Sequence, residues 1–248
     1  MSARKADKAF VQKARMRVRK AVDEFGLIAP GDRIVVGLSG GKDSAVLLDA
    51  LAWLRQMDGY RFELAAVHVD LTDVPYHVED AILRSFTARY GIDYVRLSDD
   101  RPVVNGPKHP CFYCAWNRRK RLFQWAADHG YGTVALGHHA DDFAETLLMN
   151  MIYHGEYAAF KPRQSMFDGQ LHIVRPLFYL SDHQTQRYAQ LIRYTPPPYN
   201  CPFAGDNHRE RFRSLMRQIK QMHPKALENM LRAARNLNTD YLPPPEAE

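Results

Sequence analysis

The chain has 248 residues, of which 46% are hydrophobic, and its formal net charge at pH 7 is +6. This hydrophobic content is enough to build a core, and the absence of any run of about 18 apolar residues excludes a transmembrane helix. Residues 1–20 are charged throughout and have no apolar segment typical of a signal peptide, so we expect a cytoplasmic protein.

The positive charge is concentrated in three segments. Residues 4–20 carry eight Lys or Arg against one acidic residue, residues 118–121 are all basic, and residues 208–235 carry eight more basic residues against two acidic ones. Such clusters are the electrostatic pattern of nucleic-acid binders, although solvated helix faces produce it as well. From charge alone, both interpretations stay open.

Strand and helix patterns alternate along the chain. Apolar runs that predict buried strands occupy residues 34–37, 63–69, 94–97, 133–136 and 172–174. Apolar residues at helical spacing predict helices over residues 8–26, 45–55, 74–90, 116–129, 141–153, 182–193, 209–222 and 224–238. This alternation predicts an α/β fold, in which a five-stranded parallel sheet has helices on both faces and is extended by an N-terminal helix and a C-terminal helical region.

The segment Ser39-Gly40-Gly41-Lys42-Asp43-Ser44 lies between the first predicted strand and the next helix. Glycines let the backbone approach an anion closely, and the N–H groups at a helix start point towards it. Ser39, Ser44 and Lys42 add donors for phosphate oxygens, and Asp43 is our first candidate ligand for Mg²⁺. The spacing excludes a Walker A loop, which has four residues between its glycines and Ser or Thr after the lysine. The loop resembles the SGGxDS signature of the PP-loop ATP pyrophosphatases.

Polar side chains follow the ends of two more predicted strands, where ligands bind in parallel sheets. His68 and Asp70 close the second strand, and the segment Gly137–Asp142 follows the fourth. The residues that we expect to border the nucleotide are His68, Asp70, Gly137, His138, Asp141 and Asp142, with Asp141 or Asp142 as the second candidate for Mg²⁺. The structural alternatives are that His68 and Asp70 are satisfied at the core edge and that Asp141 is only a helix N-cap.

The chain has three cysteines, Cys111, Cys114 and Cys201. The first two are spaced as Cys-x-x-Cys at the start of a helix, a position that favours thiolates. Their chemistry has three interpretations: a zinc site completed by His109 or His208, a redox dithiol, or an iron–sulfur cluster with three protein thiolates. A fourth interpretation is that all three are buried and inert, as cysteines often are. The spacing alone does not decide between them.

Together the motifs resemble the tRNA 2-thiocytidine synthetases of the TtcA type. The resemblance rests on Ile28–Ser44, on Cys111-x-x-Cys114 followed by basic residues, on Gly137–Asp142, on Val174–Leu177 and on the downstream Cys201. It implies that Ser39–Ser44 bind ATP and that the three cysteines hold a 4Fe–4S cluster. It also implies tRNA as substrate and a homodimer. We further expect a sulfur donor such as a cysteine desulfurase and, from the lack of a long apolar run, no membrane partner. The family pattern has a second cysteine shortly after the position of Cys201, where this chain has Ala204.

The reaction implied by the resemblance makes 2-thiocytidine at position 32 of the anticodon loop. The C2 oxygen of cytidine attacks the α-phosphate of ATP, pyrophosphate leaves, and sulfur then displaces AMP. The expected catalytic residues are Lys42, Asp43, Cys111, Cys114 and Cys201. The side chains that we expect to contact tRNA phosphates are Arg118, Arg119, Arg121, Arg209, Arg211 and Arg213. Two alternatives stay open: a cluster-free PP-loop ligase that adds an amine, and a nucleotide-binding redox or ATP sensor without turnover.

We expect four segments along the chain. Residues 1–30 form a basic N-terminal helix, and residues 31–180 form the PP-loop ATP-binding α/β domain with the Cys-x-x-Cys motif. Residues 181–242 form a helical region with the third cysteine and the basic helices. Residues 243–248 are expected to be a disordered tail.

Overall fold

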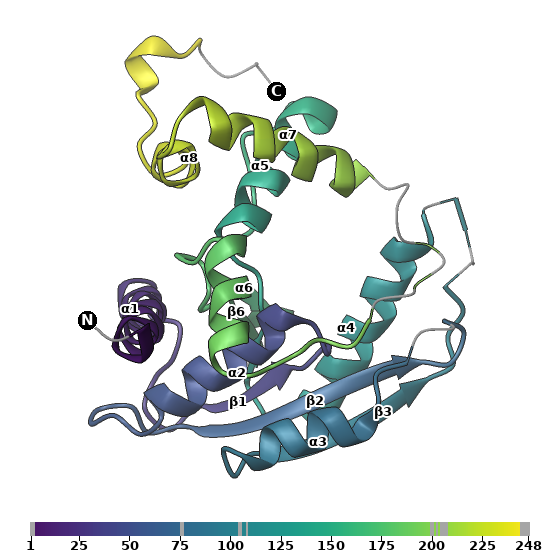
Figure 1. Cartoon of the computed structure of the whole chain (residues 1–248). Helices are drawn as coiled ribbons and strands as arrows, with labels where there is room; N and C mark the ends of the chain where they lie inside the picture. The colour runs from purple at the N-terminus through teal and green to yellow at the C-terminus, as the bar shows by residue number, and fades with distance from the viewer. Residues whose placement is uncertain are drawn as a thin grey trace. The chain divides into compact units, whose positions relative to one another are not determined.

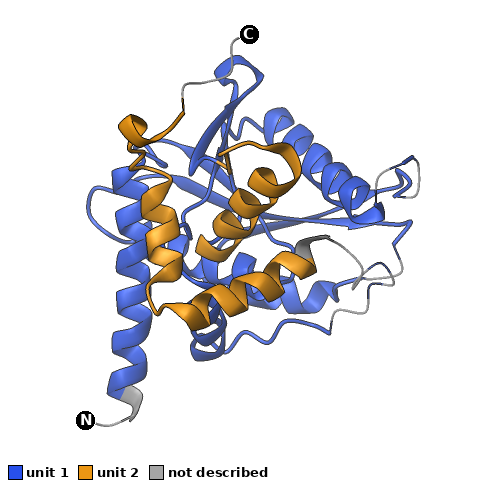
Figure 2. Cartoon of the chain, turned by 90° about the horizontal axis from the view of Figure 1, so that it is seen from above, with its two compact units in different colours: residues 1–139, 161–207 blue, residues 140–160, 208–248 orange. Residues whose placement is uncertain are grey.

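The computed structural model describes residues 3–74, 77–103, 106–107, 109–198, 201, 203 and 208–243, without the side chains of residues 3, 4, 208 and 209. The chain forms two compact units (Figure 2): residues 1–139 with 161–207, and residues 140–160 with 208–248. The four segments expected from the sequence stay predictions, and residues 244–248 of the expected tail lie outside the described residues. No helix in the described ranges is long and apolar enough to cross a membrane.

A six-stranded sheet forms the centre of the first unit (Figure 1). The strands are β1 (Arg33–Gly37), β2 (Glu63–Leu71), β3 (Asp93–Asp99), β4 (Thr133–Ala135), β5 (Arg163–Met166) and β6 (Leu171–Val174), and their order in the sheet is β3-β2-β1-β4-β6-β5. All pairings are parallel except that of β5 with β6. The predicted α/β fold with helices around a mainly parallel sheet is therefore confirmed.

The predicted number of five strands is wrong, because β5 adds an antiparallel strand at the edge of the sheet. Its sequence Arg-Gln-Ser-Met has no β-branched run, so the pattern did not indicate a strand. A short 3-10 turn, η1 (Phe167–Gly169), joins β5 to β6, and all three of its residues have positive φ values of 51°, 53° and 90°. The strand therefore depends on this reversal and on pairing with β6.

Five helices surround the sheet of the first unit: α1 (Ala3–Glu24), α2 (Lys42–Leu54), α3 (Asp80–Ala88), α4 (Pro110–Asp128) and α6 (Asp182–Leu191). Helix α4 packs against β2, β3 and β4, on the face that carries Val35, Val67 and Val134. Successive strand residues point to opposite faces, so Val36 and Ala66 lie on the other face, where α2 contacts β1 and β2. Helices α1 and α6 pack against α2.

Helix α4 begins at Pro110, whereas the sequence pattern predicted a start at residue 116. The ring nitrogen Nδ1 of His109 caps the helix by accepting a hydrogen bond from the Cys111 N–H at 3.2 Å, and Pro110 occupies the first helical position, where its missing N–H costs nothing. Cys, Phe and Tyr are modest helix formers, which hid this first turn in the sequence. As a result, Cys111 and Cys114 both lie at the start of α4.

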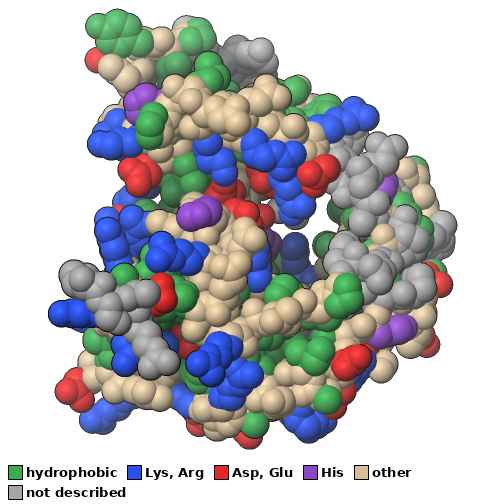
Figure 3. All heavy atoms as spheres, in the orientation of Figure 1, with side chains coloured by type: hydrophobic (Ala, Val, Ile, Leu, Met, Phe, Trp, Pro, Cys, Tyr) green, Lys and Arg blue, Asp and Glu red, His purple; other side chains and the backbone are tan. Residues whose placement is uncertain are grey.

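The second unit consists of α5 (Ala140–His154), α7 (His208–Met222), α8 (Ala226–Ala233) and the short η2 (Thr239–Tyr241). Helix α5 packs against α7 and α8. Figure 3 shows Lys and Arg side chains gathered along α7. Two cations of α7 pair with buried acids of α5: Lys220 Nζ lies 2.6 Å from Asp141, and Arg213 Nε lies 3.8 Å from Glu145. The basic helix is thus partly neutralised within its own unit.

Asp49 of α2 joins helices α1 and α6 and the turn after α3 through one buried carboxylate. Its side chain is 2% exposed and accepts hydrogen bonds from Arg15 Nη2 at 2.8 Å, from the Tyr188 hydroxyl at 2.6 Å and from the Tyr90 hydroxyl at 3.0 Å. Burial, reinforced by the charge of Asp49, raises the pKa of both tyrosines far above the ordinary value. Both hydroxyls therefore stay protonated and remain donors.

Replacing Asp49 with Ala leaves Arg15 and two hydroxyls without their shared acceptor. We expect the free energy of unfolding to fall by about 3 kcal/mol, the usual cost of breaking a buried ion pair. Urea denaturation followed by circular dichroism measures this loss. The matched control is Glu63→Ala, which removes the exposed partner of Arg33 and should have far less effect. Equal losses in the two variants would contradict the role assigned to Asp49.

Candidate active site

The loop Ser39–Ser44 runs from β1 into the first turn of α2 and is held by its own hydroxyls. Ser44 Oγ donates to the Gly41 carbonyl at 2.9 Å and accepts from the Ser39 N–H at 3.2 Å, while Ser39 Oγ accepts from the Gly41 N–H at 3.2 Å. Gly40 has a φ of 85°, and the Tyr194 hydroxyl donates to its carbonyl at 2.7 Å. Helix α2 begins after Gly41, its N-cap residue, which provides no side-chain cap, so the helix start is suited to an anion.

His68 supports this loop from β2. Its Nδ1 lies 2.7 Å from the Leu38 carbonyl, and its Nε2 lies 3.0 Å from Asp70, which in turn pairs with Arg96. His68 is 2% exposed and Asp70 is 5% exposed. Because both ring nitrogens are engaged, His68 acts on the site by fixing Leu38, the residue before Ser39. Contact of His68 or Asp70 with a nucleotide stays a prediction.

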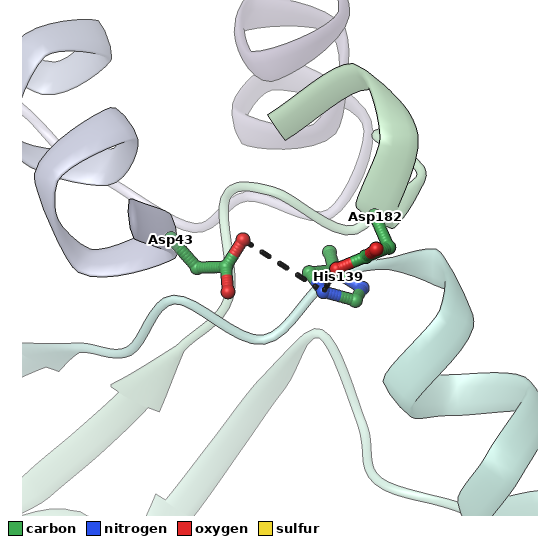
Figure 4. Close-up of side chains that lie close together, drawn as sticks. All are labelled: Asp43, His139 and Asp182. Carbon is green, nitrogen blue, oxygen red and sulfur yellow. Dashed lines mark ion pairs between the residues drawn. The ribbon is translucent and has the colours of Figure 1, made fainter. Parts of the chain in front are cut away.

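Five charged or polar side chains meet beside the loop, three of them shown in Figure 4. Lys42 Nζ lies 2.7 Å from Asp43 Oδ1, 2.7 Å from Asp182 Oδ1 and 3.2 Å from Thr185 Oγ1. Nε2 of His139, which is buried, lies 3.5 Å from Asp182 and 3.8 Å from Asp43. One ammonium group and one imidazole thus lie between two carboxylates from different helices.

The charged forms of Lys42 and Asp182 stabilise each other. The hydrogen bond from His139 and the one from Lys42 hold the pKa of Asp182 well below its usual range, although burial opposes this. Burial alone lowers the pKa of Lys42, but the Asp43 and Asp182 carboxylates outweigh it and raise this pKa. At neutral pH Asp182 is therefore ionised and Lys42 is cationic.

The same cluster contains ligands for a divalent cation. One ligand atom each from Asp43, His139 and Asp182 lies within 4.8 Å of the others. Mg²⁺ prefers oxygen ligands, so Asp43 and Asp182 are the fitting pair and His139 is a partner that orients them. The sequence singled out Asp43 but named Asp141 or Asp142 as the second ligand; Asp141 pairs with Lys220 in the second unit. The role of Asp141 and Asp142 at the nucleotide stays a prediction.

Gly137 allows the segment after β4 to approach the start of α2. A Cβ atom at this position would lie 3.0 Å from the Asp43 carbonyl carbon and 3.0 Å from the Ser44 nitrogen. Backbone atoms cannot move aside as a flexible side chain can. The glycine is thus required for the packing that brings His139 towards Asp43.

A cavity of about 170 Å³ separates the phosphate loop from α4. Leu38, Ser39 and His138 line it on the sheet side, and Ala115, Arg118 and Arg119 line it on the α4 side. Arg118 Nε is buried and has no hydrogen-bond partner among the described residues. A buried donor of this kind requires an acceptor, which a ligand in the cavity would provide.

Arg175 adds a further buried cation near this cavity. It is 4% exposed, and its Nε donates to His138 Nδ1 at 3.3 Å. Burial, together with the charge of Arg119, lowers the pKa of Arg175 to about 10, so it is still protonated at neutral pH. The positive potential of these arginines suits a phosphate.

The three cysteines come together at the start of α4. None of these described cysteines forms a disulfide and all three are half-buried; Cys111 Sγ lies 3.6 Å from the carbonyl of Phe203, two residues after Cys201. Burial raises the pKa of the Cys114 thiol; Arg118 opposes this, and the nearby Cys111 and Cys201 add to it. Three sulfur donors at one place, with a cation one helical turn away, fit a cluster that has three protein thiolates.

Three residues that the sequence did not single out lie at this site: Arg175, Asp182 and Thr185. His139 lies in the predicted segment Gly137–Asp142 but was not among the chosen nucleotide contacts. The GHHxDD motif contains His139, and Asp182 follows Ser181 in a capping box at a predicted helix start, but neither signal indicates proximity to Asp43. Of the expected tRNA contacts, Arg118 and Arg119 line the cavity, Arg211 and Arg213 lie on α7, and the Arg209 side chain lies outside the described residues. The tRNA contacts stay predictions.

The fold and the loop define a class of nucleotide-binding protein, and the family model described as "PP-loop domain" matches residues 11–196. A "tRNA-cytidine(32) 2-sulfurtransferase" from Stenotrophomonas maltophilia (strain R551-3) is 35% identical over 232 residues, which cover 90% of this chain and 76% of the relative. A protein of the same name from Geobacter sulfurreducens is 33% identical, covering 93% of this chain and 92% of the relative. The chain therefore belongs to the PP-loop family of the tRNA-cytidine(32) 2-sulfurtransferases.

The fold is also similar to that of a solved structure, the "U34-tRNA thiolase NcsA from Methanococcus maripaludis with its 4Fe-4S cluster". The TM-score is 0.75, the sequence identity is 22%, and the match covers 92% of this chain and 78% of the other. At a sequence identity of 22%, the structural similarity supports the assignment of the fold.

Replacing Gly137 with Ala forces a methyl group against the backbone of Asp43 and Ser44. We expect the free energy of unfolding to fall by roughly 1–3 kcal/mol, the usual cost of overpacking. Gly132→Ala is the matched control on the other side of β4, because a Cβ atom there meets nothing within 4 Å. Thermal unfolding of the two variants measures the difference, and a Gly137 variant as stable as the Gly132 variant would disprove the close approach.

Proposed function

We propose that this protein is an ATP-dependent tRNA sulfurtransferase, which adenylates the C2 oxygen of a cytidine and replaces it with sulfur. The observation that carries the proposal is the position of α4. Its start bears Cys111 and Cys114, with Cys201 beside them, and its next turn lines a cavity with Ser39 of the phosphate loop. The names of the relatives support cytidine 32 of tRNA as the target.

The phosphate loop and Lys42 perform the first half of the reaction. The C2 oxygen attacks the α-phosphate of ATP, the bond between the α- and β-phosphates breaks, and pyrophosphate leaves. The N–H groups at the start of α2 and the ammonium of Lys42 stabilise the charge that develops on pyrophosphate. Asp43 and Asp182 would hold Mg²⁺, which when bound supplies further neutralisation of the phosphate oxygens.

The three cysteines serve the second half. Cys111, Cys114 and Cys201 would hold a 4Fe–4S cluster, which when bound would supply the sulfur chemistry of this half. The arginines around the cavity have a separate task. Arg118 and Arg119 face the space in which the adenylated base would lie, and they stabilise the phosphate that departs as AMP.

The partners follow from this chemistry. The substrate is tRNA, whose unpaired anticodon-loop bases can be turned out of their stack. The sulfur originates from a donor such as a cysteine desulfurase, and the enzyme acts as a homodimer in the cytoplasm. Its basic segments contact the tRNA backbone.

Two variants, one at a cysteine and one in the phosphate loop, test the proposal. Protein prepared without oxygen should show the visible absorption of an iron–sulfur cluster and release pyrophosphate from ATP only with tRNA. Cys201→Ala should lose this absorption and thiolation but still bind ATP. Lys42→Met should keep the absorption and lose pyrophosphate release by roughly a hundredfold or more. A colourless protein that contains zinc, or a Cys201 variant that retains both properties, would overturn the proposal.

A second test uses Asp182, a residue that only the structure identified and that contacts Lys42. Asp182→Asn keeps the shape of the side chain but removes a charge shared with Lys42. We expect tRNA-dependent pyrophosphate release to fall by roughly ten- to a hundredfold, with a higher requirement for Mg²⁺. His183→Asn changes the neighbouring exposed residue and should leave both quantities unchanged. Similar rates for the two variants would remove Asp182 from the nucleotide site.

A further inference from the structure

Helix α4 carries an exposed aromatic and basic stripe on the edge that does not face the cavity. Phe112, Trp116 and Lys120 are four residues apart, so they follow one another along one side of the helix. Phe112 is 45% exposed and Trp116 is 57% exposed, whereas Leu122, Phe123 and Trp125 of the same helix are buried. The aromatic side chains of the stripe are therefore not part of the core.

These side chains border a groove of about 390 Å³, which also involves Tyr113, Asn117 and the segment at Arg101. The floor of the groove is fixed by hydrogen bonds. Asn117 Nδ2 donates to the carbonyls of Arg101 and Pro102 at 3.2 Å each, and Arg101 Nη2 donates to the Asn117 carbonyl at 3.1 Å. Arg101 also pairs with the buried Asp99. The groove is thus held in shape without a ligand.

The charge of α4 favours an anionic polymer. Residues 118–121 are consecutive cations, and the helix has no acidic residue before Asp128, its last residue. Exposed aromatic faces next to cations are the means by which proteins bind unpaired nucleotides: the rings stack on bases and the cations contact phosphates. The stripe begins at Phe112, the residue after Cys111, and therefore runs beside the proposed sulfur site.

We propose that Phe112, Trp116 and Lys120 form a stacking platform for unpaired nucleotides next to the target base. The inference deepens the proposed function and rests on it, because it takes the RNA substrate from there. The target nucleotide would enter the cavity on one edge of α4. A neighbouring base would stack on Trp116 at the other edge, and Lys120 would contact the adjoining phosphate.

The test measures RNA binding rather than turnover. The probe is a fluorescent anticodon stem-loop with cytidine at position 32, titrated into the anaerobically prepared full-length protein. Trp116→Ala should weaken binding by roughly fivefold or more, the range found for base–aromatic stacking, and Trp116→Phe should retain most of the affinity. Lys120→Ala should lower the slope of binding against salt concentration by about one unit.

Two further readouts make the outcomes distinct. The stem-loop should quench the fluorescence of wild-type protein but not that of Trp116→Phe, in which only Trp53 and Trp125 remain. Unchanged affinity in Trp116→Ala, together with quenching that persists in Trp116→Phe, would overturn the platform and leave the proposed function standing. Failure of the wild-type protein to bind the stem-loop would overturn the proposed function itself. Loss of a dimer in Trp116→Ala, with unchanged RNA affinity, would show that the stripe is an interface between copies and would overturn the inference.

Discussion

Helix α4 holds Cys111 and Cys114 at a fixed distance from the phosphate loop, because its inner face is buried against the sheet. Leu122, Phe123 and Ala126 pack into the same cluster as Val35, Val67 and Val134. A helix rises only about 1.5 Å per residue, so Cys114 and Arg118 are about one turn apart. The cavity at Arg118 and the cysteines at the start of α4 therefore lie next to each other on the same helix. Such proximity is required if adenylation and sulfur transfer act on the same base.

The second constraint is electrostatic. Asp43 and Asp182 originate from different helices, and two nearby carboxylates repel each other unless a cation lies between them. The ammonium of Lys42 lies 2.7 Å from each carboxylate and meets this requirement in the structure. The arrangement suits the proposed nucleotide site, since the phosphates of ATP would offer Lys42 a new partner and the carboxylates would then be available to hold Mg²⁺. The capping box that starts α6 fixes Asp182 in position for this exchange.

The sequence predicts the parts of the site that are contiguous along the chain. Ser39–Ser44 form the expected turn between a strand and a helix, and Cys111 and Cys201 lie near Cys114, while their role as ligands of a cluster stays a prediction. Asp182 was not predicted, because its meeting with Lys42 depends on how α6 packs on α2. Strand β5 was missed because its polar residues pair only through a tight reversal. The start of α4 was missed because a histidine cap and weak helix formers conceal it.

The central claim is that the oxygen removed from cytidine becomes bonded to the α-phosphate of ATP. A tRNA that carries a heavy oxygen isotope at C2 of the target cytidine tests this most directly, with mass spectrometry of the nucleotide products after one turnover. If the account is right, the label appears in AMP in equal amount to the thiolated base. Label found in water or pyrophosphate, with unlabelled AMP, would contradict it.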